Sequence, residues 1–274
     1  MRIRLVIYSV LIMLFILTGC STNSNYDEFE KTLSKDQALK QLEQMNLPFN
    51  ARTFIQCSTE GDTSAVKVFL DAGMDINVVN KETTALIEAA RKSHIDIVKL
   101  LLERGVDVNW GKDGKGTALY WAVMDSYSKT EEIVALLLQH GADVNAKTMR
   151  GYTPLMVAPN KEIASMLAES GGDIHARTEE NDTVLFKACM NEQVDIVKYL
   201  LEKGAVSDIN VAENLSQWTP LIAGVESIEI VKLLLENGAD VNHRDKINTT
   251  ALGYATIKGN QEIVKLLKQY GGIE

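Results

Sequence analysis

A short motif recurs along this chain at nearly constant spacing, and this recurrence restricts the possible folds more than any other feature. The motif is Gly-x-Asp-φ-Asn, where φ is an apolar residue, and it or a variant of it begins every 30 to 36 residues. Full copies begin at Gly73, Gly105, Gly141 and Gly238, and variants begin at Gly171, Gly204 and Gly271. A period of this length is typical of a solenoid, in which each repeat packs only against its neighbours.

The residues before each motif predict a pair of helices. In one copy, residues 84–90 (TALIEAA) precede residues 96–102 (DIVKLLL). Thr84 can cap the first helix through its hydroxyl, and the small pair of alanines that follows lets a second helix approach closely. The second helix is apolar over a broad stripe that one repeat cannot bury alone, and Gly105 can end it in the left-handed conformation. The pattern within each repeat therefore favours stacking of the repeats.

Together these segments resemble the ankyrin repeat, whose pattern is Thr-Pro-Leu-His, an Ala-Ala pair, Val-Val-x-Leu-Leu-Leu and Gly-Ala-Asp-Val-Asn. The resemblance covers residues 50–274, in about seven repeats. It implies an all-α solenoid of helix-turn-helix repeats with β-hairpin fingers, monomeric, that binds a protein of unknown identity through its fingers and first helices. The His of the family pattern is missing from every copy, and other residues replace it: Ile55, Ile87, Tyr120, Met156, Phe186, Ile222 and Gly253.

Several repeats depart from the regular length. Repeat three has three additional residues between Met124 and Thr130, beside a cluster of aromatic residues: Tyr120, Trp121 and Tyr127. Repeats four and six are short near Asn160 and Ser227, which predicts that their helices or the turns between them are clipped. Before the first repeat, residues 34–49 form a predicted capping segment, with an amphipathic helix that begins after Ser34.

The first 20 residues have the features of a secretory signal. Two arginines precede an uncharged apolar run over residues 5–18, which is too short to span a bilayer comfortably as a helix. The run ends in Leu17-Thr18-Gly19-Cys20, which resembles the lipobox of bacterial lipoproteins. That resemblance implies a signal peptide over residues 1–19, acyl chains such as palmitate on Cys20, and a tether over residues 20–33. The alternative is a plain signal peptide or an uncleaved anchor that ends in cysteine by chance.

A lipid on Cys20 would place the chain in the cell envelope. In a Gram-positive host the expected site is the outer face of the cytoplasmic membrane, and in a Gram-negative host it is the periplasmic face of the outer membrane. Ser21, in place of an aspartate after the cysteine, favours the outer membrane in the second case.

No group of residues in the sequence predicts catalysis, a metal site or a cofactor site. The histidines, His94, His140, His175 and His243, lack metal-ligand spacing, and the glycine-rich residues 111–117 lack the spacing of a phosphate-binding loop. Cys57 and Cys189 fall at the alanine-pair positions of repeats one and five, too far apart for a disulfide, so we expect them reduced and buried. The net charge of −9 argues against nucleic acid and is compatible with a basic protein partner.

Large side chains that the repeat pattern does not require are the candidate partner-binding residues. In the predicted fingers these are Trp110, Met149, Tyr152 and Trp218. At the ends of first helices they are Arg91, Lys92, Met190 and Asn191. Exposed aromatic residues dominate many protein interfaces. The favoured function is a lipid-anchored scaffold or adaptor in the envelope; the alternative is an immunity protein that caps a toxic envelope enzyme. Enzymatic activity of the chain itself is not predicted.

Overall fold

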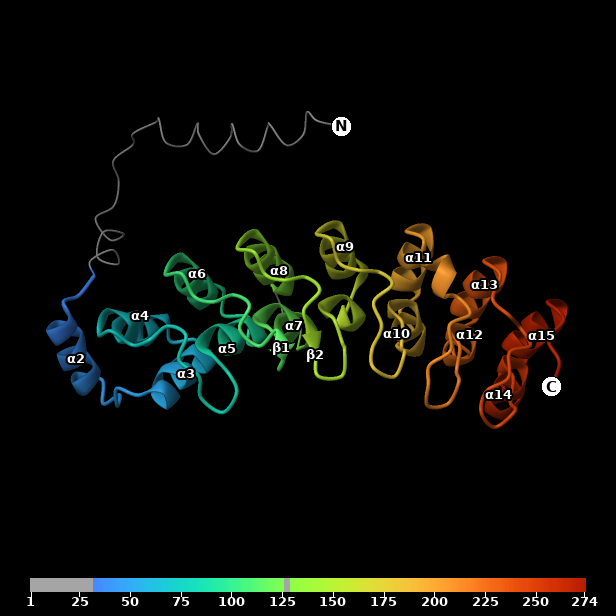
Figure 1. Ribbon diagram of the computed structural model, residues 1–274, viewed down its shortest axis with the longest axis horizontal. Helices are drawn as coiled ribbons and strands as arrows, with labels where there is room; N and C mark the ends of the chain where they lie inside the picture. Colours follow the sequence, from blue (N-terminus) through green and yellow to red (C-terminus); the bar gives the residue numbers. More distant parts are fainter. Residues whose placement is uncertain (1–31, 126–128) are drawn as a thin grey trace, which may run out of the picture.

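The computed structural model describes residues 32–125 and 129–274, and these residues form a row of stacked helix pairs that runs from α2 to α15 (Figure 1). The predicted signal peptide, Cys20 and Tyr127 lie outside the described residues. Within the described residues, no helix is both long and apolar enough to cross a membrane. The predicted all-α solenoid is confirmed.

Each repeat contributes one helix to each of two rows. The first helices are α3 Ala51–Glu60, α5 Ala85–Arg91, α7 Ala118–Met124, the 3-10 helix η1 Pro154–Val157, α10 Val184–Met190, α12 Pro220–Ala223 and α14 Ala251–Lys258. The second helices are α4 Thr63–Asp71, α6 Ile95–Glu103, α8 Thr130–Gln139, α9 Lys161–Glu169, α11 Val194–Glu202, α13 Ile228–Glu236 and α15 Gln261–Gln269. Neighbouring helices pack within each row and across each pair, so the core is continuous along the stack.

Threonine side chains begin most of the first helices. Those of Thr84, Thr117, Thr183 and Thr250 each accept a hydrogen bond from the backbone N–H three residues on. Repeats four and six differ, because a proline follows the threonine and the first helix is only four residues long. In these two repeats the buried hydroxyls of Thr153 and Thr219 have no hydrogen-bond partner within the described residues. The predicted clipping of repeats four and six is confirmed.

The recurring motif joins each repeat to the next. Asp107 accepts the N–H of Asn109 at 2.9 Å and so shapes the turn. The amide of Asn109 then donates to the carbonyl of Gly141 at 3.0 Å and accepts the N–H of Asp143 at 2.7 Å. Asn145, Asn210 and Asn242 make the same pair of contacts to the following copy. The asparagine clamp is therefore the physical reason for the recurrence of the motif.

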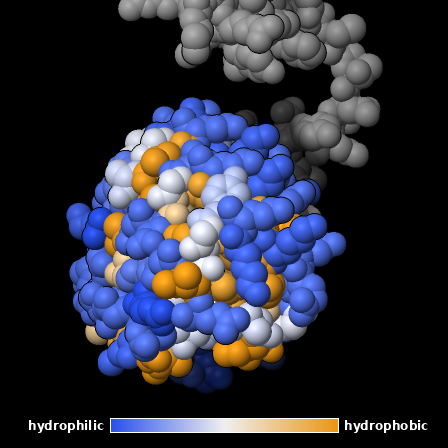
Figure 2. Space-filling model, turned by 90° about the vertical axis from the view of Figure 1, so that its right-hand side faces the viewer, coloured by the Kyte–Doolittle hydropathy of each residue, from blue (hydrophilic) through white to orange (hydrophobic). Residues whose placement is uncertain are grey.

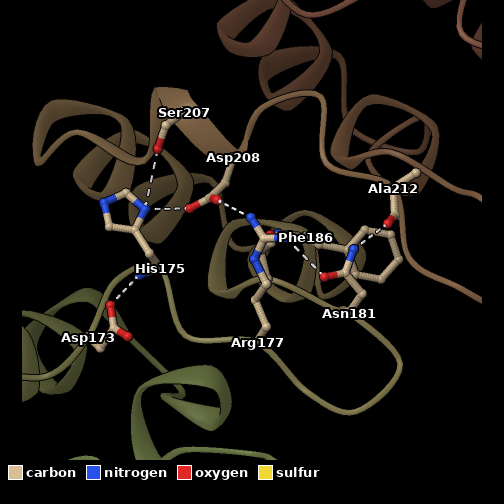
Figure 3. Close-up of polar contacts among 9 residues, drawn as sticks. Asp173, His175, Arg177, Asn181, Phe186, Ser207, Asp208 and Ala212 are labelled. Carbon is tan, nitrogen blue, oxygen red and sulfur yellow. Dashed lines mark hydrogen bonds and ion pairs between the residues drawn. The ribbon is translucent and has the colours of Figure 1, made fainter.

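One clamp, between repeats four and five, has a different chemistry. His175 stands where the motif has asparagine, and its Nδ1 lies 2.6 Å from Oδ2 of Asp208 (Figure 3). The two additional residues of this copy form part of the short 3-10 helix η2, Ala205–Asp208, which carries Asp208 to a buried position. Arg177 approaches the same carboxylate at 3.4 Å. A contact between ionisable side chains thus replaces an asparagine clamp at this junction.

A helix without a repeat motif covers the N-terminal end of the stack. Helix α2, Lys35–Gln44, begins with a capping box in which Ser34 and Gln37 each accept the other's backbone N–H. Its buried residues, Ala38 and Leu42, face the stack, where α2 packs against α4. At the other end, polar and apolar side chains alternate on the surface (Figure 2), and Ile257 and Ile273 are exposed there.

The loops between successive repeats, which we call fingers, contain little β-structure. Strands β1, Asp113–Gly114, and β2, Lys147–Thr148, pair in parallel and join two neighbouring fingers. Within fingers, single antiparallel bridges join Asn80 to Thr83 and Arg177 to Thr183. The hairpins predicted for the fingers are present only as these short turns, because the loops have too few residues for longer strands.

Candidate functional site

A groove of about 950 Å³ runs across repeats two, three and four on the side of the first helices and fingers. Its floor comes from α5, α7 and η1, and its rim comes from three successive fingers. The apolar residues that line it are Ile87, Tyr120, Trp121, Met124, Met149, Tyr152 and Val157. A groove of this size accommodates several side chains of a bound partner.

Two aromatic rings of α7 form the centre of the floor. Tyr120 and Trp121 make an edge-to-face contact with their ring centroids 5.4 Å apart. The indole N–H of Trp121 donates to the carbonyl of Lys115 at 3.3 Å, which holds the ring against the finger. Gly116 makes this possible, because a Cβ atom there would lie 2.8 Å from the indole nitrogen and its φ is +87°. Burial raises the pKa of the Tyr120 phenol, which therefore stays neutral.

Two methionines lie at the mouth of the groove. The side chain of Met149 is 77% exposed and that of Met124 is 49% exposed, values that leave both free to contact a partner. The backbone N–H of Met149 donates to the carbonyl of Gly114 at 2.7 Å, so the exposed side chain stands on a fixed finger. Methionine side chains adapt their shape to bound surfaces, and exposed apolar groups of this kind mark interaction sites.

Charged residues surround this apolar floor. The cations that line the groove are Lys81, Arg91, Lys115 and Arg150, and the carboxylates are Glu82 and Glu88. Glu88 is largely buried. Its carboxylate accepts hydrogen bonds from Arg91 at 2.8 Å and from Thr83 at 2.9 Å. Among the described residues, no carboxylate lies within 4.0 Å of the charged groups of Lys81 or Arg150. The groove therefore has a positive rim in a chain whose net charge is −9.

The structure brings together some of the residues predicted from sequence to bind a partner. Arg91, Met149 and Tyr152 line the groove, and Trp110 borders it, because Lys115 Nζ lies 5.4 Å from the Trp110 ring centroid. Tyr152 is half-buried, with Lys187 Nζ 5.1 Å from its ring centroid.

The other predicted residues are not among those that line the groove. Lys92 caps the end of α5, and Met190 and Asn191 are exposed at the end of α10. Trp218 is half-buried in a later finger, where its indole N–H donates to Asp245 at 3.1 Å and its ring packs edge-to-face on Tyr254. The indole of Trp218 is therefore a structural part of that finger.

Sequence reasoning did not place several groove residues at the site. Trp121 stood out as part of an aromatic cluster, and Ile87 stood out as a replacement for the family histidine, but neither was assigned to the site. Their position in the repeat could have indicated the site, because equivalent positions of successive first helices face the same side of the stack. Lys81 and Arg150 carry no such signal, because finger tips vary freely in sequence.

The chemistry that this arrangement supports is recognition. Within the described residues, no three histidine, cysteine or acidic side chains come together in a way that could hold a metal ion. Cys57 and Cys189 are free and buried, which confirms the prediction of reduced, buried thiols.

Comparison with known proteins agrees with the repeat pattern. A family profile described as ankyrin repeats (3 copies) matches residues 19–111, 53–148, 110–178 and 159–245, and another, ankyrin repeats (many copies), matches residues 226–267. The putative ankyrin repeat protein YahD of Escherichia coli K12 is 31% identical, over 81% of this chain and 96% of YahD. The ankyrin repeat protein nuc-2 of Neurospora crassa is 27% identical over 79% of this chain, which spans only 24% of nuc-2. The crystal structure of the human ASB11 ankyrin repeat domain superposes with a TM-score of 0.66 at 26% identity, over 81% of this chain and 98% of that domain.

Proposed function

The chain belongs to the ankyrin-repeat family, and from this premise we propose that it is a scaffold or adaptor that a lipid on Cys20 anchors in a bacterial cell envelope. Ankyrin repeats are protein-interaction modules, and in this chain the side formed by fingers and first helices carries the groove. To this general role in protein binding, the proposal adds a membrane anchor and a particular surface for the partner.

The observation that supports this assignment of the binding surface is the groove across repeats two to four. Three consecutive repeats contribute to it, and the apolar side chains of Met124 and Met149 are exposed there between charged finger tips. An apolar surface of this kind is costly to leave exposed unless a partner covers it. Two of the three fingers that form the rim are joined by the β1–β2 pair, so this part of the surface is organised before a partner binds.

The anchor is supported by the sequence of the first 20 residues, which precede the described part of the chain. Residues 20–33 separate Cys20 from the helix that covers the N-terminal end of the stack. An extended segment of 14 residues reaches about 45 Å, which is enough to hold the repeats clear of the lipid headgroups.

Photocrosslinking in intact cells tests this function. A photoreactive phenylalanine analogue replaces Met149 in the full chain or, as a matched control, Lys198, which is exposed on the second helix α11. We expect position 149 to form a discrete product with a protein of the membrane fraction and position 198 not to form it. Absence of any product from position 149, or equal products from both positions, would contradict the proposal.

A further inference from the structure

We propose that the groove binds an acidic segment of the partner protein, in which carboxylates flank aromatic or large aliphatic side chains. This inference rests on the proposed function and adds the chemistry of the partner. It also reverses, for this surface, the expectation of a basic partner that follows from the net charge of the whole chain.

The charge of the groove differs in sign from that of the chain. Four cations and two carboxylates line the groove, whereas the chain as a whole has 28 basic and 37 acidic residues. One of the two carboxylates, that of Glu88, is satisfied internally by Arg91 and Thr83. The other, Glu82, lies 4.0 Å from Lys115. Arg91 also lies 3.7 Å from the carboxylate of Asp125, so the positive charge that is free to attract an acidic segment is that of Lys81 and Arg150.

The cations and the apolar residues come from different elements, and this separation defines the expected pattern of the ligand. Lys81 and Arg150 lie at finger tips, and Lys115 lies on the finger between them, whereas the rings of Tyr120 and Trp121 belong to α7. An inserted side chain would therefore contact the floor, and residues before and after it would meet the rim. Carboxylates at those flanking positions would pair with the finger cations.

The finger tips that carry the two unpaired cations are held in place by the backbone. Lys81 and Glu82 have φ values of 49° and 61°, which form the tight turn closed by the bridge between Asn80 and Thr83. The carbonyl of Arg150 accepts the N–H of Glu179 from the next finger at 3.1 Å. The backbone that carries each cation is therefore fixed, one in the first and one in the third of the fingers that line the groove, which favours a ligand of defined register.

Other ligand classes fit this surface less well. A basic segment would bring like charge to Lys81 and Arg150, which have no carboxylate of the described residues to neutralise them. A nucleic acid would be repelled at long range by the net charge of −9. The observations therefore favour an acidic peptide segment over both.

Selection from a random peptide library tests this inference. The full chain, purified in mild detergent, is used to select from displayed peptides of about twelve residues, which reach about 40 Å when extended and so span three repeats. The selected peptides are then measured for affinity to wild type and to Lys81→Glu, Arg150→Glu and Met149→Gln. Lys198→Glu is the control, because it makes the same charge change on an exposed residue of α11.

We expect the selected peptides to carry aspartate or glutamate on both sides of an aromatic or large aliphatic residue. Each charge reversal in the groove should weaken their binding by about tenfold or more, consistent with the loss of a charge-assisted contact. Met149→Gln should weaken it without lowering the melting temperature, and Lys198→Glu should leave it unchanged. Failure to select any peptide, selection of basic peptides, or equal affinity for Arg150→Glu and wild type would overturn the inference. If the crosslink from position 149 persists in that case, the proposed protein-binding function stands, and only the inference that the partner segment is acidic fails.

Discussion

Asp245 holds a finger together with a single carboxylate. It accepts the N–H groups of Ile247 at 3.1 Å and Thr249 at 2.8 Å, the indole N–H of Trp218 at 3.1 Å and the hydroxyl of Tyr254 at 2.6 Å. Burial by itself raises the pKa of Asp245, but these four hydrogen bonds outweigh it and hold the pKa below its ordinary value of 3.8. The charged form is therefore favoured by folding.

This predicts an acid-dependent part of the stability. Because the folded-state pKa is lowered, the contribution is present above the ordinary pKa of 3.8 and is lost as the pH falls through the lowered value. Asp245→Asn should cost about 1–3 kcal/mol of unfolding free energy at neutral pH, as expected for hydrogen bonds to a charged group. Urea titrations at a series of pH values should show this cost shrinking as the pH falls below 3.8. A cost that stays constant with pH would show that charge is not involved.

The two thiols give a second prediction at this scale. Burial raises the pKa of Cys57 to about 11 and raises that of Cys189 further, so both stay protonated at neutral pH. A thiol reagent needs both the thiolate and access to the sulfur. We expect neither cysteine to react in the native protein and both to react in denaturant, as followed by mass spectrometry. Rapid labelling of the native chain would contradict their buried placement.

Among the elements, two fingers carry aromatic residues with different roles. The Trp218 side chain packs on Tyr254 and bonds to Asp245, both from the next repeat, so Trp218→Ala should cost about 2–4 kcal/mol of stability. Tyr152 lines the groove, so Tyr152→Ala should weaken partner binding by about 1–3 kcal/mol. Thermal melting and affinity, measured on both variants, separate the two effects.

Leu101→Ala serves as the control for this comparison. Leu101 is fully buried in α6, and its truncation should cost about 2–5 kcal/mol of stability while leaving the affinity of the folded protein unchanged. If Tyr152→Ala melts early and binds normally, its ring is a packing residue and the partner contacts other parts of the groove.

The elements themselves could be predicted from sequence because their signals are local. The apolar stripe of α6, the threonine cap of α5 and the glycine after α6 all lie within one repeat. The structural role of Trp218 could not be predicted, since its hydrogen-bond partner Asp245 lies 27 residues away in the next repeat. The groove could not either, because it exists only where three repeats bring their floors and finger tips together.

At the scale of the whole molecule, the proposed anchor would determine where the solenoid works. Cys20→Ala should remove both the labelling by radioactive palmitate and the partition into detergent that we expect of the full chain, because two or more acyl chains hold a protein stably at a membrane. Ser21→Ala, one residue on, should retain both. A Cys20→Ala chain that is still processed and retained in the membrane would contradict lipidation at this residue.

The asparagine clamps also have a mechanical consequence. Each clamp spans one junction, so a load applied between the two ends of the stack passes through the junctions in series. The array therefore acts as an elastic rod whose compliance is the sum of its junctions. At the junction between repeats four and five the contact of His175 with Asp208 replaces the asparagine clamp, so we expect the stiffness there to differ from that of the other junctions. In force spectroscopy we expect the repeats before this junction and the repeats after it to unfold in separate steps.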